Sequence, residues 1–143
     1  FILLLLMMGH AQAIDYANEG NIKAAVVTAH PLASQVGKEI IAAGGNAFDA
    51  MVATELALAV SYPVAGNLGG GGFMVYRTAN GNIGSLDYRE KAPLAATRDM
   101  YLDDSGDVIP GKSTLGVASI GVPGTIAGVF EVHQKFGSPS RRL

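Results

Sequence analysis

A run of four glycines at positions 69–72 constrains this chain more than any other feature of its sequence. Glycine loses more backbone entropy on folding than any other residue. Such a run therefore predicts a place where another backbone or a ligand comes closer than a Cβ atom would allow.

The residues after the glycines predict a β-hairpin. Segments 73–77 and 83–88 flank Asn80-Gly81, a dipeptide typical of tight type I′ turns, in which both residues have positive φ. Arg89 then comes at the end of the second strand, beside the glycine loop.

Arg89 has two possible roles at this position. A guanidinium is a planar fork that matches a carboxylate with two parallel hydrogen bonds, so Arg89 could bind an anionic ligand. Alternatively, it pairs with Asp87 or Glu90 on a solvated surface, where ion pairs contribute little to stability. The pattern alone leaves both interpretations open.

Several separated motifs occur in the same order as in one known family. They are QVGK at 35–38, AGGNAFDA at 43–50, GNLGGGGFM at 66–74, DYREKAP at 87–93, TRDMYLDD at 97–104 and GVPGT at 121–125. From about residue 24 to about residue 137, the chain resembles the start of the large subunit of the gamma-glutamyltranspeptidases, or glutathione hydrolases.

The resemblance implies an α+β fold, the N-terminal part of the four-layer αββα sandwich of the N-terminal-nucleophile hydrolases. Residues 14–143 would then be the N-terminal part of the large subunit, as a fragment. The residue pattern agrees, because buried helices followed by a hairpin are typical of helices packed on an antiparallel sheet.

The resemblance also implies a function. In this family a precursor cleaves itself, and the new N-terminal Thr of the small subunit attacks a gamma-glutamyl amide such as that of glutathione. The acyl-enzyme is passed to water or to an amino acid. Glutathione and other gamma-glutamyl compounds would be the substrates, the small subunit the partner, and no cofactor is implied.

Two residues match the family's site within this sequence. Arg89 matches the arginine that binds the α-carboxylate of the glutamyl group, and Glu90 matches an acid that we interpret as supporting the site. The nucleophilic Thr is not in this sequence, so we expect the fragment alone to be inactive. A stand-alone exported binding or structural domain remains the alternative.

The first 13 residues predict a truncated secretory signal peptide. An apolar run at 1–8 precedes Ala11-Gln12-Ala13, a small-x-small pattern of the kind that signal peptidase cleaves. The run is too short to span a bilayer. We therefore expect a periplasmic or extracellular protein, with a buried N-terminal strand as the alternative.

Composition argues against other classes of function. The formal charge of −2 offers no basic footprint for nucleic acid or an anionic membrane. The absence of cysteine excludes disulfides and thiolate sites. Charged residues make up only 15% of the chain, against about 25% in typical domains, which indicates tightly packed segments.

Hydrophobic spacing predicts three helices, at 32–43, 47–60 and about 123–135. Asn46 is the expected N-cap of the second helix, which is apolar on nearly all sides and should be buried all round. Short strands are predicted at 24–28 and 117–122.

Three further sequence patterns are only weak evidence for nucleotide or metal binding. Residues 106–113 fit the P-loop pattern GxxxxGK[ST], but an acidic turn precedes them and no helical period follows, so a nucleotide site at Lys112 is an unfavoured alternative. The acidic turn 103–107 resembles a calcium loop, but Val108 occupies the position where an EF-hand needs its glycine. The histidines His10, His30 and His133 lack ligand spacing, so no metal is expected.

Overall fold

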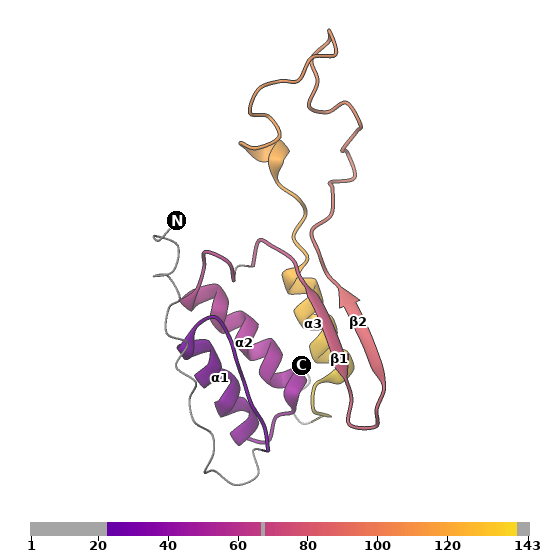
Figure 1. Cartoon of the computed structure of the whole chain (residues 1–143). Coiled ribbons are helices and arrows are strands. Elements are labelled where there is room, and N and C mark those ends of the chain that lie inside the picture. Colours follow the sequence, from indigo (N-terminus) through magenta and orange to yellow (C-terminus); the bar gives the residue numbers. More distant parts are fainter. Residues whose placement is uncertain (1–22, 67, 140–143) are drawn as a thin grey trace, which may run out of the picture.

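The computed structural model describes residues 23–66 and 68–139. Three helices lie beside one β-hairpin, and a long excursion projects away from them (Figure 1). The elements are α1 (Pro31–Ala42), α2 (Ala47–Ser61), β1 (Phe73–Arg77), β2 (Ile83–Asp87), the 3₁₀ helix η1 (Val117–Ser119) and α3 (Thr125–Phe136). The α+β prediction is confirmed. The predicted signal segment, residues 1–13, lies outside the described residues.

Asn46 caps the start of α2, as the sequence predicted, and Asp49 completes a capping box with it. The Asn46 side chain accepts hydrogen bonds from the backbone N–H groups of Phe48 (2.9 Å) and Asp49 (3.0 Å). In return, the Asp49 carboxylate accepts the Asn46 N–H at 2.9 Å. These bonds satisfy N–H groups that have no partner within the helix.

The prediction that α2 is buried all round is wrong for the described chain. Only Asp49, Ala50 and Thr54 are buried in this helix, whereas Val60 is 83% exposed. Helices α1 and α3 pack against α2. Several other apolar residues of α2 are only partly covered, and Leu56 is exposed as well.

The predicted hairpin forms, but its turn and its register differ from those of a two-residue turn at Asn80-Gly81. Phe73 pairs with Asp87 at one end and Arg77 with Ile83 at the other. The connection spans residues 78–82, and within it only Gly81 has positive φ, at 91°. A type I′ turn also needs positive φ at Asn80, so this turn is a different one.

One face of the hairpin packs on the helices and the other is exposed. On the inner face, the Tyr76 ring lies 5.8 Å from that of Phe48 in α2 and 4.7 Å from that of Phe136 in α3, measured between centroids. On the outer face, Phe73 and Val75 are exposed. The aromatic contacts therefore attach the sheet to two helices through one face.

Neither additional predicted strand forms in the described chain. Residues 24–28 have no regular secondary structure and pair with neither strand of the hairpin. Gly116, at φ 78°, leads into the 3₁₀ helix η1 instead of a strand. From the second predicted strand only Val122 pairs, through two hydrogen bonds with Lys91.

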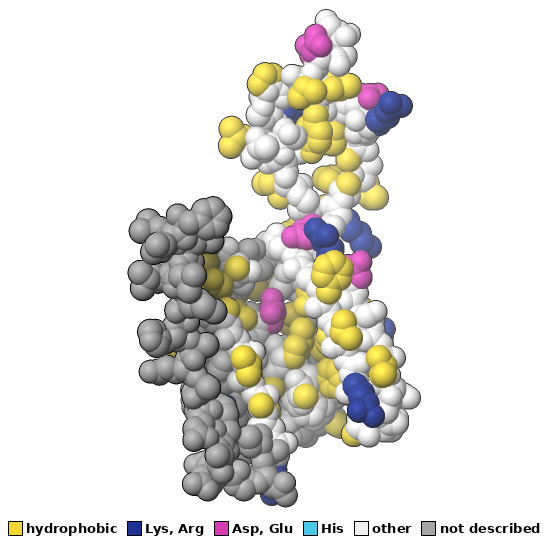
Figure 2. Space-filling model, viewed as in Figure 1, with side chains coloured by type: hydrophobic (Ala, Val, Ile, Leu, Met, Phe, Trp, Pro, Cys, Tyr) yellow, Lys and Arg dark blue, Asp and Glu magenta, His cyan; other side chains and the backbone are white. Residues whose placement is uncertain are grey.

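The Lys91–Val122 pair closes the base of the excursion, residues 92–121 (Figure 1). Within it, the Tyr101 hydroxyl donates to the Ala118 carbonyl at 2.9 Å. Apolar side chains lie open on its surface (Figure 2), among them Leu94 and Leu115. Among the described helices, none has the length and apolar character needed to cross a membrane.

Candidate functional site

Arg89 lies just beyond the end of β2, where the glycine loop crosses it. One hydrogen-bonded pair extends the ladder past Asp87: the Tyr88 N–H donates to the Gly72 carbonyl at 3.0 Å, and the Gly72 N–H donates to the Tyr88 carbonyl at 3.4 Å. The sequence prediction that Arg89 sits at a strand end beside the glycines is therefore correct.

The glycines allow two backbones to touch at this point. A Cβ atom on Gly71 would lie 2.7 Å from both the Arg89 Cα and the Glu90 nitrogen. On the other side, a Cβ atom on Gly124 would overlap the Tyr88 carbonyl. The segment that carries Arg89 is thus held between the glycine loop and the start of α3, as the glycine run predicted for a close backbone approach.

The glycine loop also contacts the start of α3 directly. The Gly70 carbonyl accepts the N–H groups of Gly124 (2.9 Å) and Thr125 (3.1 Å). Helix N-termini leave such N–H groups without partners inside the helix. One loop therefore fixes both α3 and the strand end that carries Arg89.

Tyr88 fills the space between the glycine loop and α3, a role that the sequence analysis missed. Its ring lies where Cβ atoms on Gly72 or Gly128 would collide with it. Burial raises the pKa of the Tyr88 hydroxyl, and the charge of Glu55 adds to the effect. Small residues at 124 and 128, one helical turn apart, were the sequence signal for this close packing.

The Arg89 side chain is largely free of hydrogen-bonding partners among the described residues. It is 63% exposed, and its Nε lies 3.9 Å from Glu90 Oε2, beyond hydrogen-bond distance. Asp87 accepts the backbone N–H of Arg89 at 3.0 Å and not its guanidinium. The Arg89 guanidinium carbon lies 5.6 Å from the centre of the Phe73 ring. The surface-pair interpretation therefore has only the loose Glu90 contact in its favour.

An open hollow of about 360 Å³ adjoins Arg89. Tyr88, Lys91 and Glu131 contribute to its lining, together with the small residues Gly124 and Gly128. This volume lies within the range of small-ligand sites, which begins at about 300 Å³. The hollow brings Arg89 and Lys91, two cations, to the same place.

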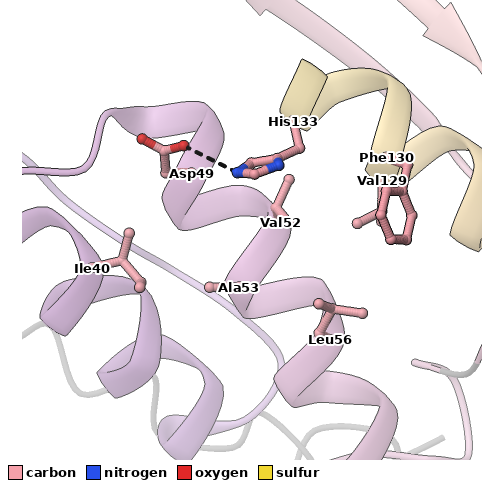
Figure 3. Close-up of a pocket in the computed structure, with 8 residues that line it drawn as sticks. All are labelled: Ile40, Asp49, Val52, Ala53, Leu56, Val129, Phe130 and His133. Carbon is pink, nitrogen blue, oxygen red and sulfur yellow. Dashed lines mark ion pairs between the residues drawn. The ribbon is translucent and has the colours of Figure 1, made fainter. Parts of the chain in front are cut away.

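A second hollow, of about 310 Å³, lies between α2 and α3 (Figure 3). Its polar group is the Asp49–His133 pair, with 3.9 Å between Oδ1 and Nε2. Burial alone would raise the pKa of Asp49, but hydrogen bonds from Ser138 and Asn46, with His133 nearby, outweigh it and lower that pKa.

Asp49 has a structural role. The Ser138 hydroxyl donates to its carboxylate at 2.6 Å, and the Asn46 side chain donates to the Phe136 carbonyl at 2.7 Å. These bonds join the start of α2 to the end of α3. The described residues contain no cluster of three or more side chains suited to a metal.

The P-loop pattern folds into consecutive turns. The N–H groups of Lys112 and Thr114 donate to the carbonyls of Ile109 (3.3 Å) and Gly111 (3.0 Å), so they are already used within the loop. No helix begins in residues 113–116. In the preceding acidic turn, the Asp103 carboxylate accepts the N–H groups of Ser105 and Asp107. Both segments have the geometry of surface turns.

The chain is similar to one known protein family and to individual members of it. The family model for gamma-glutamyltranspeptidase matches residues 33–142. The chain belongs to the gamma-glutamyltranspeptidase family. It is 51% identical over 133 residues to the glutathione hydrolase proenzyme of Pseudomonas sp. (strain A14), covering 93% of this chain and 23% of that protein. With the glutathione hydrolase proenzyme of Escherichia coli (strain K12), it is 50% identical over 113 residues, covering 79% of this chain and 20% of that protein.

Solved structures of gamma-glutamyltranspeptidases have the same fold in this region. The Helicobacter pylori enzyme superposes with a TM-score of 0.79 at 48% identity, over 85% of this chain and 35% of that one. The Pseudomonas nitroreducens enzyme complexed with L-DON gives 0.75 at 50% identity, over 80% and 34%. The chain spans about a fifth of the length of the Pseudomonas sp. and Escherichia coli proenzymes.

Proposed function

We propose that this chain is part of a gamma-glutamyltransferase and glutathione hydrolase, and that Arg89 binds the α-carboxylate of the gamma-glutamyl donor. The family membership supports the reaction, and the environment of Arg89 supports its role. Glutathione and related gamma-glutamyl amides are the proposed substrates.

One observation supports the substrate role of Arg89: its backbone is tightly packed, while its guanidinium makes no hydrogen bond to any described residue. Gly71 and Gly124 pack against the backbone of residues 88–90, whereas among the described residues the guanidinium of Arg89 has only an ion-pair contact with Glu90, at 3.9 Å. A guanidinium on a fixed backbone, with N–H donors open to a ligand, suits a carboxylate, because two parallel hydrogen bonds can form at once.

The rest of the reaction needs groups beyond this chain. The proposed nucleophile is the N-terminal Thr of a small subunit made from the same precursor. That Thr forms a gamma-glutamyl-enzyme, which is passed to water or an amino acid. Arg89 orients the donor for this attack, and Glu90 supports Arg89 through their shared electrostatic contact. Residues 14–143 would form the N-terminal part of the large subunit.

We propose that the protein is exported to the periplasm or the extracellular space. The proposal rests on the apolar run and the small-x-small pattern in residues 1–13. Sequencing the N-terminus of the exported protein should find it near Ile14. A mature N-terminus upstream of Ala11 would show that this pattern is not cleaved.

The substrate role is tested by Arg89→Lys in the complete proenzyme. Lysine keeps the charge but lacks the planar fork, so we expect kcat/KM for a gamma-glutamyl anilide to fall more than about tenfold. Arg98→Lys is the matched control, because Arg98 is 95% exposed and lies on the excursion. Equal kcat/KM values for Arg89→Lys and Arg98→Lys would show that Arg89 is an ordinary surface charge and does not bind the substrate.

A further inference from the structure

The strand register places an aromatic ring beside the proposed carboxylate-binding group. Phe73 opens β1 directly opposite Asp87 of β2. Arg89 follows Asp87 by two residues, and alternate residues of a strand point to the same face. Because the Gly72–Tyr88 hydrogen bonds extend the ladder, Arg89 is a diagonal neighbour of Phe73 on the outer face.

We propose that Phe73 is a positioning residue that holds the Arg89 guanidinium ready for the substrate carboxylate. This inference rests on the function proposed for Arg89 above. The guanidinium carbon lies 5.6 Å from the ring centroid, within the roughly 6 Å at which an aromatic face attracts a cation.

A ring suits this task better than a carboxylate would. It attracts the cation without accepting any of its N–H donors, so all of them stay available for the ligand. Glu90 cannot replace it at 3.9 Å, because that distance is too long for a hydrogen bond to Nε. Holding a long side chain in place beforehand also lowers the entropy lost when the substrate binds.

The ring itself has a defined place. Its strand neighbour Met74 is buried, and the pairing of Phe73 with Asp87 fixes the start of β1. Phe73 is nevertheless 64% exposed, so its replacement removes little internal packing among the described residues. In the complete proenzyme, Phe73→Tyr and a double-mutant cycle with Arg89 separate positioning from any packing that the rest of the protein adds.

The test is Phe73→Leu in the complete proenzyme, which keeps an apolar side chain but removes the ring. We expect KM for a gamma-glutamyl anilide to rise roughly two- to fivefold with kcat little changed, the size of a cation–π contact at a partly exposed site. Phe73→Tyr should restore the original KM, since tyrosine keeps the aromatic face.

A double-mutant cycle separates positioning from a general structural effect. In the Arg89→Ala background, Phe73→Leu should cause no further loss of kcat/KM, because the cation is absent. Val75→Ala, two residues along the same exposed face, is the control and should leave KM unchanged.

Two results would overturn the positioning role alone. They are an unchanged KM in Phe73→Leu, and an equal loss of kcat/KM in the Arg89 and Arg89→Ala backgrounds. If Arg89→Ala itself leaves KM unaltered, the substrate role of Arg89 fails first, and the role of Phe73 fails with it.

Discussion

The contact between the glycine loop and the Arg89 backbone predicts a large effect of the substitution Gly71→Ala. The added Cβ would lie 2.7 Å from three backbone atoms, one each in Tyr88, Arg89 and Glu90. Backbone atoms cannot rotate away as a side chain can, so the loop or the strand end must shift. Gly71 is not among the glycines with positive φ, so its own conformation does not exclude alanine.

The magnitude follows from this overlap. Forcing an extra carbon into a packed site costs typically about 1–3 kcal/mol of stability. The shift also moves Arg89, and a displacement of about 1 Å in a substrate-positioning group can cost about a hundredfold in rate. We expect Gly71→Ala in the complete proenzyme to lose at least tenfold in kcat/KM for a gamma-glutamyl anilide, together with part of its thermal stability.

Gly81→Ala is the matched control. Gly81 has φ 91° and no atom within 4 Å of an added Cβ, so alanine there strains the hairpin turn without touching Arg89. We expect a stability loss of about 1–2 kcal/mol and an unchanged kcat/KM. If Gly71→Ala keeps full kcat/KM, or if Gly81→Ala loses as much, the glycine loop does not position Arg89.

Two further predictions concern stability. Asp49→Asn should weaken the junction between α2 and α3 by about 1–3 kcal/mol near neutral pH, seen as faster hydrogen exchange at the Asn46 and Ser138 amides, which donate to the Asp49 carboxylate. The pKa of Asp49 is lowered in the folded state. The stability that its carboxylate adds is therefore present above the unfolded-state pKa of about 3.9 and is lost as the pH falls through the folded-state pKa. A stability difference between wild type and Asp49→Asn that persists at low pH would contradict this. Residues 14–143 made alone should neither hydrolyse a gamma-glutamyl anilide nor unfold cooperatively as a stable monomer, because the outer hairpin face and part of α2 stay uncovered. A sharp thermal transition from a soluble monomer would support the stand-alone domain instead.

Local signals in the sequence predicted the elements whose causes are local. Asn46 predicted the start of α2, because an N-cap bonds to N–H groups within the first helical turn. The Asn80-Gly81 dipeptide predicted the hairpin, but not its turn type. Thr78 shows why: its N–H donates to the Asn82 carbonyl at 2.8 Å, which closes a longer loop.

Structural features that depend on contacts between distant residues could not be predicted from the sequence. Segment 24–28 has the composition of a strand, yet strand formation needs a partner, and none of the described residues pairs with it. The glycine run predicted a close backbone approach but not its partners. Gly71 approaches the backbone of residues 88–90, and from the start of α3 Gly124 approaches the Tyr88 carbonyl, 36 residues earlier in the chain. The contact between Phe73 and Arg89 depends on the register as well: a two-residue turn at Asn80-Gly81 would place Phe73 opposite Tyr88, whereas the observed pairing of Phe73 with Asp87 puts Phe73 and Arg89 on one face.

The central claim, that Arg89 binds the α-carboxylate of the donor, is tested most directly by a crystal structure of the complete protein with L-glutamate bound. We predict two parallel hydrogen bonds of about 2.7–2.9 Å between the Arg89 guanidinium and the α-carboxylate, with the Phe73 ring against the guanidinium face. A glutamate whose α-carboxylate binds other groups, with Arg89 left in solvent, would contradict the account.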